Sequence, residues 1–216
     1  MIFSKSITEI AKSPTSIFAL LGVLLLIFAV LKIRKIKFTT QKITLIGISI
    51  ALATVLQLIT ILKLPQGGSV TAGSMVPIVL ISLFYGPEVG FLSGFLLGII
   101  NFVINPFALH PVQVLFDYPL PFMAIGIIGY FKSRNLQGIL IGVVLAMVAR
   151  FACHFISGVV FFAEYTPKGT SVYLYSLLYN GSYMSLETII TCIVIAILPL
   201  KRLSKIAVKD NTISPL

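Results

Sequence analysis

The residues best suited to chemistry in this sequence are a few polar groups within long apolar stretches. Arg150 and His154 lie in one such stretch, and Tyr175, Tyr179 and Asn180 lie in the next. Polar and ionisable groups at membrane depth are costly, and they usually face the interior of a helix bundle or a water-filled cavity. We therefore expect these side chains to surround a small ligand.

Helical spacing predicts two rows of such side chains on neighbouring helices. Arg150, His154, Gly158 and Phe161 fall on one stripe, and Gly158 leaves space beside the imidazole. The second row, spaced four residues apart, consists of Tyr175, Tyr179, Tyr183 and Glu187.

A third stretch adds Asp117 and Tyr118, followed by Pro119 and Pro121, which should interrupt the hydrogen bonding of a helix. Carboxylate, imidazole, carboxamide and phenol groups beside aromatic rings suit a flat, polar heteroaromatic cation. The carboxylate would bind its charge or amine, and the rings would stack or form cation–π contacts of about 0.5–2 kcal/mol.

Structural explanations for the same residues stay open. Arg150 could form an intramembrane ion pair with Asp117 or Glu187. His154 could be a packed hydrogen-bonding residue, and the tyrosine row could belong to an aromatic belt at the membrane interface.

Composition places these residues in a membrane protein. The 216-residue chain is 58% hydrophobic and only 10% charged, and its mean hydropathy is +1.08. A soluble core of this size could not bury so much apolar surface. The net charge of +10 lies in short clusters between apolar segments, which is typical of topology signals and argues against nucleic-acid binding.

Seven apolar segments are predicted to be membrane helices: 16–31, 43–62, 72–85, 89–104, 105–131, 139–163 and 172–199. The segment 64–70 reads as a loop because of its Pro and Gly content. Gly90, Gly94 and Gly98 form a stripe that predicts a close-packed internal helix face.

The basic residues support this count. With the segment 32–37 in the cytoplasm, eleven Lys and Arg residues fall on the inner side, four on the outer side, and Arg150 lies within a span. The inner set is Lys32, Arg34, Lys35, Lys37, Lys42, Lys132, Arg134, Lys201, Arg202, Lys205 and Lys209. The outer set is Lys5, Lys12, Lys63 and Lys168. We therefore expect the N-terminus outside, the C-terminus in the cytoplasm, and the polar cluster at the outer end.

Other classes of chemistry find little support. Cys153 and Cys192 fall inside predicted spans, without the spacing of a metal site or the context of a disulfide. The sequence has no GxxxxGK[ST] loop for ATP, and no HExxH or GxSxG motif. We expect no cofactor and no resident metal.

Four segments resemble the thiamine-specific S component of energy-coupling factor (ECF) transporters. They are HPVQVLFDYPLPF (110–122), RFACHFISGVVFF (150–162), EYTPKG (164–169) and YSLLYNGSY (175–183). The resemblance runs from about residue 43 to 200. It implies an all-α integral membrane protein with a six-helix S-component bundle (38–200), preceded here by an extra N-terminal transmembrane helix with its basic linker (1–37) and followed by a polar cytoplasmic tail (201–216).

The resemblance also implies residue roles. The thiamine-binding residues would be Asp117, Tyr118, His154, Phe162, Tyr175 and Asn180. The helical rows described above would place Arg150, Gly158, Tyr179 and Glu187 around them. The small residues Gly47 and Ala51 would contact the transmembrane coupling subunit, which works with two ATPases, and the segment 64–70 would close the pocket. Two positions depart from the pattern, since Asp117 can be Glu in the family and Phe162 can be Trp.

Two other functions remain alternatives to thiamine import. One is an S component for another vitamin or a thiamine precursor, and the other is an intramembrane enzyme using Asp117, His154 or Glu187 as acid or base. A purely structural scaffold is a third reading.

Overall fold

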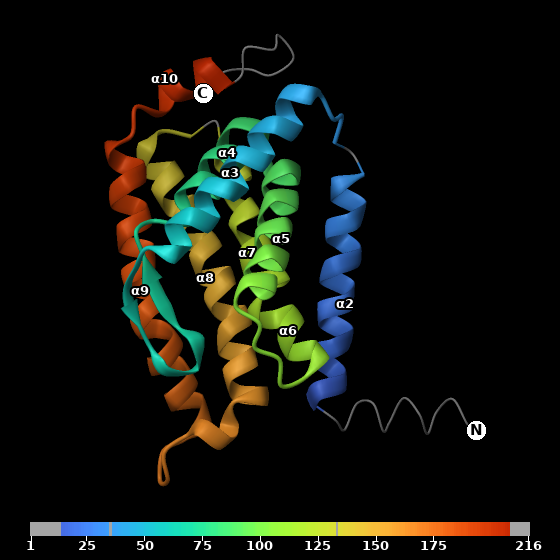
Figure 1. Cartoon of the computed structure of the whole chain (residues 1–216), viewed down its shortest axis with the longest axis vertical. Helices are drawn as coiled ribbons and strands as arrows, with labels where there is room; N and C mark the ends of the chain where they lie inside the picture. The colour runs from blue at the N-terminus through green and yellow to red at the C-terminus, as the bar shows by residue number, and fades with distance from the viewer. Residues whose placement is uncertain (1–13, 35, 133, 208–216) are drawn as a thin grey trace, which may run out of the picture.

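The computed structural model describes residues 14–34, 36–132 and 134–207, and helices dominate this part of the chain (Figure 1). Its elements are α2 (Pro14–Ile33), α3 (Thr40–Leu58), β1 (Thr60–Lys63), η1 (Pro65–Gly67), β2 (Ser69–Thr71), α4 (Val76–Tyr85), α5 (Pro87–Ile104), α6 (Pro111–Asp117), α7 (Pro119–Met123), η2 (Ala124–Phe131), α8 (Leu136–Phe161), η3 (Ala163–Tyr165), α9 (Val172–Ile197) and α10 (Leu200–Ala207), where η marks a 3₁₀ segment.

Five helical stretches of the described residues are long and apolar enough to cross a membrane: Thr40–Leu58, Pro87–Ile104, Pro111–Phe131, Leu136–Phe161 and Val172–Ile197. They confirm the prediction of an all-α integral membrane protein. Side assignments for Lys5, Lys12, Lys35 and Lys209 fall outside the described residues, as do both ends of the chain.

The predicted second and third spans differ from the structure. Helix α3 ends at Leu58, and residues 60–71 form an antiparallel hairpin instead of further helix and loop. Helix α4 has only ten residues, about 15 Å at 1.5 Å per residue, so it cannot alone cross an apolar core of ~30 Å. Figure 1 shows the hairpin continuing from the end of α3 towards the end of the bundle where α8 and α9 are joined.

The hairpin is a short antiparallel pair with a tight tip. Leu62 pairs with Val70 and Lys63 with Ser69, and the tip turns through Gln66 and Gly67, whose φ angles are 57° and 94°. Non-helical backbone at membrane depth is tolerated where it is buried in protein or lines a cavity. The hairpin meets this condition, because Thr71 is buried against the bundle and Lys63 lines the cavity described below.

Close packing between α5 and the following broken span fixes the central helices. A Cβ atom at Gly98 would lie 2.5 Å from the carbonyl oxygen of Tyr118, and one at Gly94 would overlap the carbonyl of Phe122. The predicted glycine stripe is therefore a close-packed internal face, as expected.

The predicted proline break lies at the end of α6. Helix α6 ends at Asp117, Tyr118 leaves helical geometry (φ −120°, ψ −80°), and Pro119 starts α7. The break places the Asp117 carboxylate at a helix end, where the chain turns at the cavity wall.

Helix α2 packs beside α5, α6 and α7. Its Gly22 approaches Phe116, which is fully buried next to Asp117. At the other end of the chain, the first residues of the expected polar tail form the short helix α10, which is tied to the bundle by hydrogen bonds from Gln41 and Tyr85 to the carbonyl of Ala207.

Candidate ligand-binding site

A cavity of about 830 Å³ opens among the hairpin, α3, α5, α6, α8 and α9. It also takes in Phe107 and Tyr165, from the segments that join α5 to α6 and α8 to α9. All ten residues that the sequence placed in or around the binding site line this one cavity: Asp117, Tyr118, Arg150, His154, Gly158, Phe162, Tyr175, Tyr179, Asn180 and Glu187. The structure therefore brings together groups that are up to 70 positions apart in the sequence.

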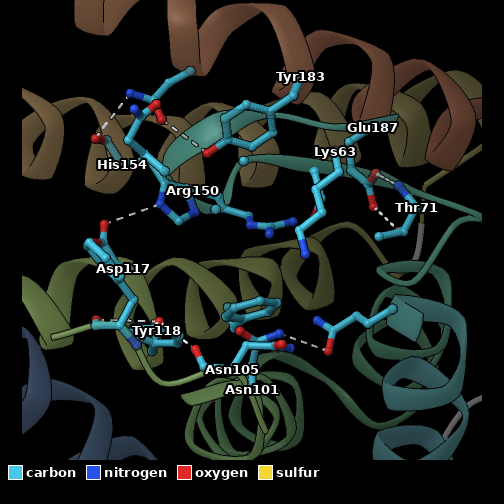
Figure 2. Close-up of a pocket in the computed structure, with 18 of the residues that line it drawn as sticks. Lys63, Thr71, Asn101, Asn105, Asp117, Tyr118, Arg150, His154, Tyr183 and Glu187 are labelled. Atoms are coloured by element: carbon cyan, nitrogen blue, oxygen red, sulfur yellow. Dashed lines mark hydrogen bonds and ion pairs between the residues drawn. The ribbon is translucent and has the colours of Figure 1, made fainter. Parts of the chain in front are cut away.

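Asp117 and His154 face each other across the cavity wall. The imidazole Nδ1 lies 3.5 Å from Asp117 Oδ1 (Figure 2). Gln113 Nε2 donates to Asp117 Oδ2. The other ring nitrogen, His154 Nε2, is buried without a protein partner. This arrangement presents a carboxylate and an imidazole to a ligand, with both side chains held in position.

Phe162 lies at the cavity, whereas Phe161 does not line it. Helix α8 ends at Phe161, and Phe162 has the non-helical angles φ −113° and ψ 17°. Its ring stacks on Phe107 with centroids 5.8 Å apart, while Phe161 stacks on His110 at 5.3 Å. The last member of the expected stripe, Phe161, therefore does not share the cavity with Arg150 and His154, and the residue just after the helix does.

Gly158 serves a different packing role from the one expected. The space beside it is taken by α9, since a Cβ atom at Gly158 would overlap Ser176 Oγ and lie 3.1 Å from Asn180 Nδ2. Asn180 Nδ2 donates to the Ser176 carbonyl at 3.0 Å, and its Oδ1 accepts from Tyr183 Oη at 3.0 Å. The glycine thus lets α8 and α9 approach and fixes the Asn180 amide.

Tyr179 and Glu187 attach the hairpin to α9. Tyr179 Oη accepts from Gly68 N at 3.1 Å and donates to the carbonyl of Pro65 at the hairpin tip. At the base, Glu187 accepts from Thr71 N at 2.8 Å and from Thr71 Oγ1 at 2.7 Å. Tyr183 is buried, and these contacts distinguish the tyrosine row from an aromatic belt at the membrane surface.

Arg150 is not in the ion pair that the sequence left open. The only ion pair among the described residues joins His154 and Asp117, and the Glu187 carboxylate is engaged by Thr71 and Ser74. The Arg150 side chain is 8% exposed, and its guanidinium carbon lies 4.6 Å from the centre of the Phe122 ring. Its Nε and Nη1 atoms are buried without hydrogen-bond partners.

Several cavity residues were missed by the sequence reasoning. Asn101 Nδ2 donates to Gln57 Oε1 at 3.0 Å, and Asn105, Gln113 and Lys63 also line the cavity. Gln57 and Asn101 are amides within apolar spans, and this is the same signal that identified Asn180. Applied to every span, it would have found them.

Comparison with known proteins gives the family. The family model described as Thiamine transporter protein (Thia_YuaJ) matches residues 43–207. The chain belongs to this family of thiamine transporter proteins. The match confirms the resemblance seen in the sequence, and it begins after α2, so this family member carries α2 outside the matched region.

Individual relatives agree with this assignment. The chain is 41% identical to the thiamine transporter ThiT of Bacillus subtilis over 168 residues, covering 71% of this chain and 87% of the relative. It is 28% identical to ThiT of Lacticaseibacillus paracasei over 140 residues, covering 57% and 70%. These relatives are named as transporters, which supports a transport role rather than catalysis.

The fold has a counterpart among solved structures. ThiT from Listeria monocytogenes superposes with a TM-score of 0.69 and 24% sequence identity, covering 77% of this chain and 96% of that one. The similarity shows that the two chains share a fold.

Proposed function

We propose that this chain is the substrate-binding membrane subunit of an ECF-type vitamin importer and that it binds thiamine from the outer side of the membrane. The observation that carries the proposal is the Asp117–His154 pair, 3.5 Å apart at the wall of an 830 Å³ cavity with aromatic rings around it. Membership of the thiamine transporter family supports the choice of ligand.

The cavity offers a partner for each part of a flat, cationic vitamin. Asp117 would accept from the aminopyrimidine, and His154 Nε2, which lacks a protein partner, would face the same ring. Phe162, supported by Phe107, would stack on a ring, and Tyr175 and Asn180 would provide further polar contacts. Charge-assisted hydrogen bonds are the strong ones in such sites.

Tyr118 would act mainly through the loop before α6. Its hydroxyl donates to the Asn105 carbonyl at 2.9 Å and accepts from Phe107 N at 3.0 Å. These bonds hold Phe107 behind Phe162, so Tyr118 would set the position of the stacked pair. The hairpin would close the cavity from the other side, anchored through Tyr179.

Gly47 and Ala51 remain the proposed contact with the coupling subunit. Both are exposed on α3, and a Cβ atom at Gly47 would meet nothing within 4 Å. A flat surface of small residues allows a partner helix to approach closely. The two ATPases would bind to the coupling subunit, and the basic segments near 32–37, 132–134 and 201–205 would face the cytoplasm.

The domain division follows the same proposal. Residues 38–200 would form the substrate-binding bundle, residues 1–37 an added helix and linker, and residues 201–216 a cytoplasmic tail. The family match over 43–207 supports the bundle as the functional unit.

Calorimetric titration of the purified protein with thiamine tests the function. We expect tight binding, and Asp117→Asn should weaken it by about ten- to a hundredfold, because hydrogen bonds to charged groups contribute ~1.5–3 kcal/mol. Glu88→Gln is the control, since Glu88 is an acidic residue outside the cavity. Absence of binding below micromolar concentrations would refute the proposal, whereas tighter binding of a pyrimidine precursor in competition would change the ligand.

A further inference from the structure

Helix α2 packs against a second, smaller hydrophobic core that lies outside the lining of the cavity. The buried members of this second core are Phe91, Phe116, Leu120 and Met123. Leu26 of α2 packs against them, and Figure 1 shows α2 running beside α5 with α6 near one of its ends. Within residues 20–27, Gly22 is buried, Leu26 is half-buried, and the rest are exposed. These two residues, one turn apart, therefore define the inner face of this part of α2.

The contacts of Gly22 lie on both sides of the break between α6 and α7. A Cβ atom at this position would lie 3.3 Å from the Phe116 ring, 3.8 Å from Leu115 and 3.7 Å from Leu120. Leu115 and Phe116 precede the break at Tyr118, and Leu120 follows it. Helix α2 therefore spans the point at which the backbone leaves helical geometry.

The second core also contacts the sequence neighbours of the two polar residues on which the proposed function depends. Phe116, which is 1% exposed, directly precedes Asp117 in α6. Cys153, which packs against the second core, directly precedes His154 in α8. Helix α6 has only seven residues, and a helix this short depends on tertiary packing for its stability. The 3.5 Å separation of Asp117 and His154 therefore depends on how α6 is held.

We propose that α2 is a positioning element of the binding site, in which Gly22 and Leu26 hold the α6–α7 break and so keep Asp117 at its distance from His154. This inference rests on the proposed function and concerns a helix that lies before the region matched by the family, which begins at residue 43. A ligand binds more tightly when packing has already fixed the groups that contact it, because less ordering is then required on binding.

Calorimetric titration of the full-length Leu26→Ala variant with thiamine tests this role. We expect the affinity to fall by about three- to tenfold, because a displaced carboxylate keeps only part of its charge-assisted hydrogen bond to the ligand. Gly22→Val, which adds bulk against the Phe116 ring, should weaken binding in the same direction. Leu24→Ala, at an exposed position of the same helix, is the matched control and should bind as the wild type does. Leu26→Met, which nearly conserves volume, should restore the affinity.

Two further measurements separate positioning from general stability. In an Asp117→Asn background, Leu26→Ala should lower the affinity by less than about twofold, because the group whose position it sets has already been altered. In the ligand-free protein, the backbone amides of residues 111–123 should exchange hydrogen faster in Leu26→Ala than in Leu24→Ala, since the break is then less firmly packed.

The outcomes distinguish the positioning role from the proposed function. Unchanged thiamine affinity in Leu26→Ala, an equal loss of affinity with and without Asp117→Asn, or unchanged exchange in residues 111–123 would each overturn the positioning role and leave the function intact. If the wild-type protein binds no thiamine while exchange still rises in Leu26→Ala, the packing of α2 on the break is upheld and the proposed function is wrong.

Discussion

Glu187 in α9 accepts hydrogen bonds from both the backbone nitrogen and the hydroxyl of Thr71 in β2, at 2.8 and 2.7 Å, across 116 positions of the chain. Both residues are buried. The Glu187 carboxylate therefore fixes the base of the hairpin. Tyr179, eight residues earlier in α9, fixes its tip. The position of this cavity wall depends on α9.

Replacing Thr71 by Val should loosen the hairpin. The change keeps the shape of the side chain but removes one donor to a buried carboxylate, which costs about 1–3 kcal/mol. We expect faster ligand dissociation with a smaller change in the association rate, measured by stopped-flow or surface plasmon resonance. Thr44→Val, at an exposed threonine of α3 that does not line the cavity, is the control. Equal dissociation rates for the two variants would contradict the anchoring role.

Phe162 and Phe161 provide a matched pair for the aromatic site. Phe162→Ala should weaken thiamine binding by roughly three- to tenfold, because an aromatic stacking contact contributes about 0.5–1.5 kcal/mol beyond its buried area. Phe161→Ala removes a ring that stacks on His110 outside the cavity lining, so its effect on calorimetric affinity should be smaller. A larger loss of thiamine affinity in Phe161→Ala than in Phe162→Ala would show that Phe161, and not Phe162, is the aromatic residue of the site.

Gly98 is predicted to be a position where even one methyl group is harmful. Gly98→Ala would place a Cβ atom 2.5 Å from the Tyr118 carbonyl, and overpacking of this kind typically destabilises by about 1–3 kcal/mol. Gly181→Ala meets nothing within 4 Å and should be neutral or stabilising, since Gly in a helix costs roughly 0.5–1 kcal/mol relative to Ala. Thermal unfolding in detergent measures both, and equal midpoints would argue against close packing at Gly98.

Gly47 should affect assembly without affecting the vitamin site. Gly47→Leu adds bulk to an exposed face of α3, with nothing within 4 Å of the new Cβ atom. We expect thiamine titrations to be unchanged and co-purification with the coupling subunit and ATPases to be lost or strongly reduced. Leu52→Ile, a volume-conserving change at another exposed α3 position, is the control. Intact assembly of Gly47→Leu would place the partner contact elsewhere.

The convergence of Asp117, His154 and Asn180 could be predicted from sequence because each is a costly polar group within an apolar span. The proline break after Asp117 and the glycine stripe of α5 could also be predicted from the sequence, because both follow from local backbone and steric rules. The break and the stripe depend on residues close together in the chain, whereas the convergence follows from the cost of each polar group in an apolar span.

The hairpin could not be predicted in the same way. Residues 60–63 continue the apolar run of α3, and periodicity does not separate a strand from a helix in so short a segment. What holds the strands in place is Glu187, far away in the sequence. The space beside Gly158 was misjudged for a related reason, because only the packed structure shows that Ser176 fills it.

The hairpin wall also bears on how a ligand enters and leaves. Its two short strands hydrogen-bond to each other, and every residue of β1 is exposed. Segments with few buried contacts open at lower free energy than packed helices. We therefore expect exchange of the ligand to begin with local opening of this segment of about a dozen residues, and not with separation of the long helices.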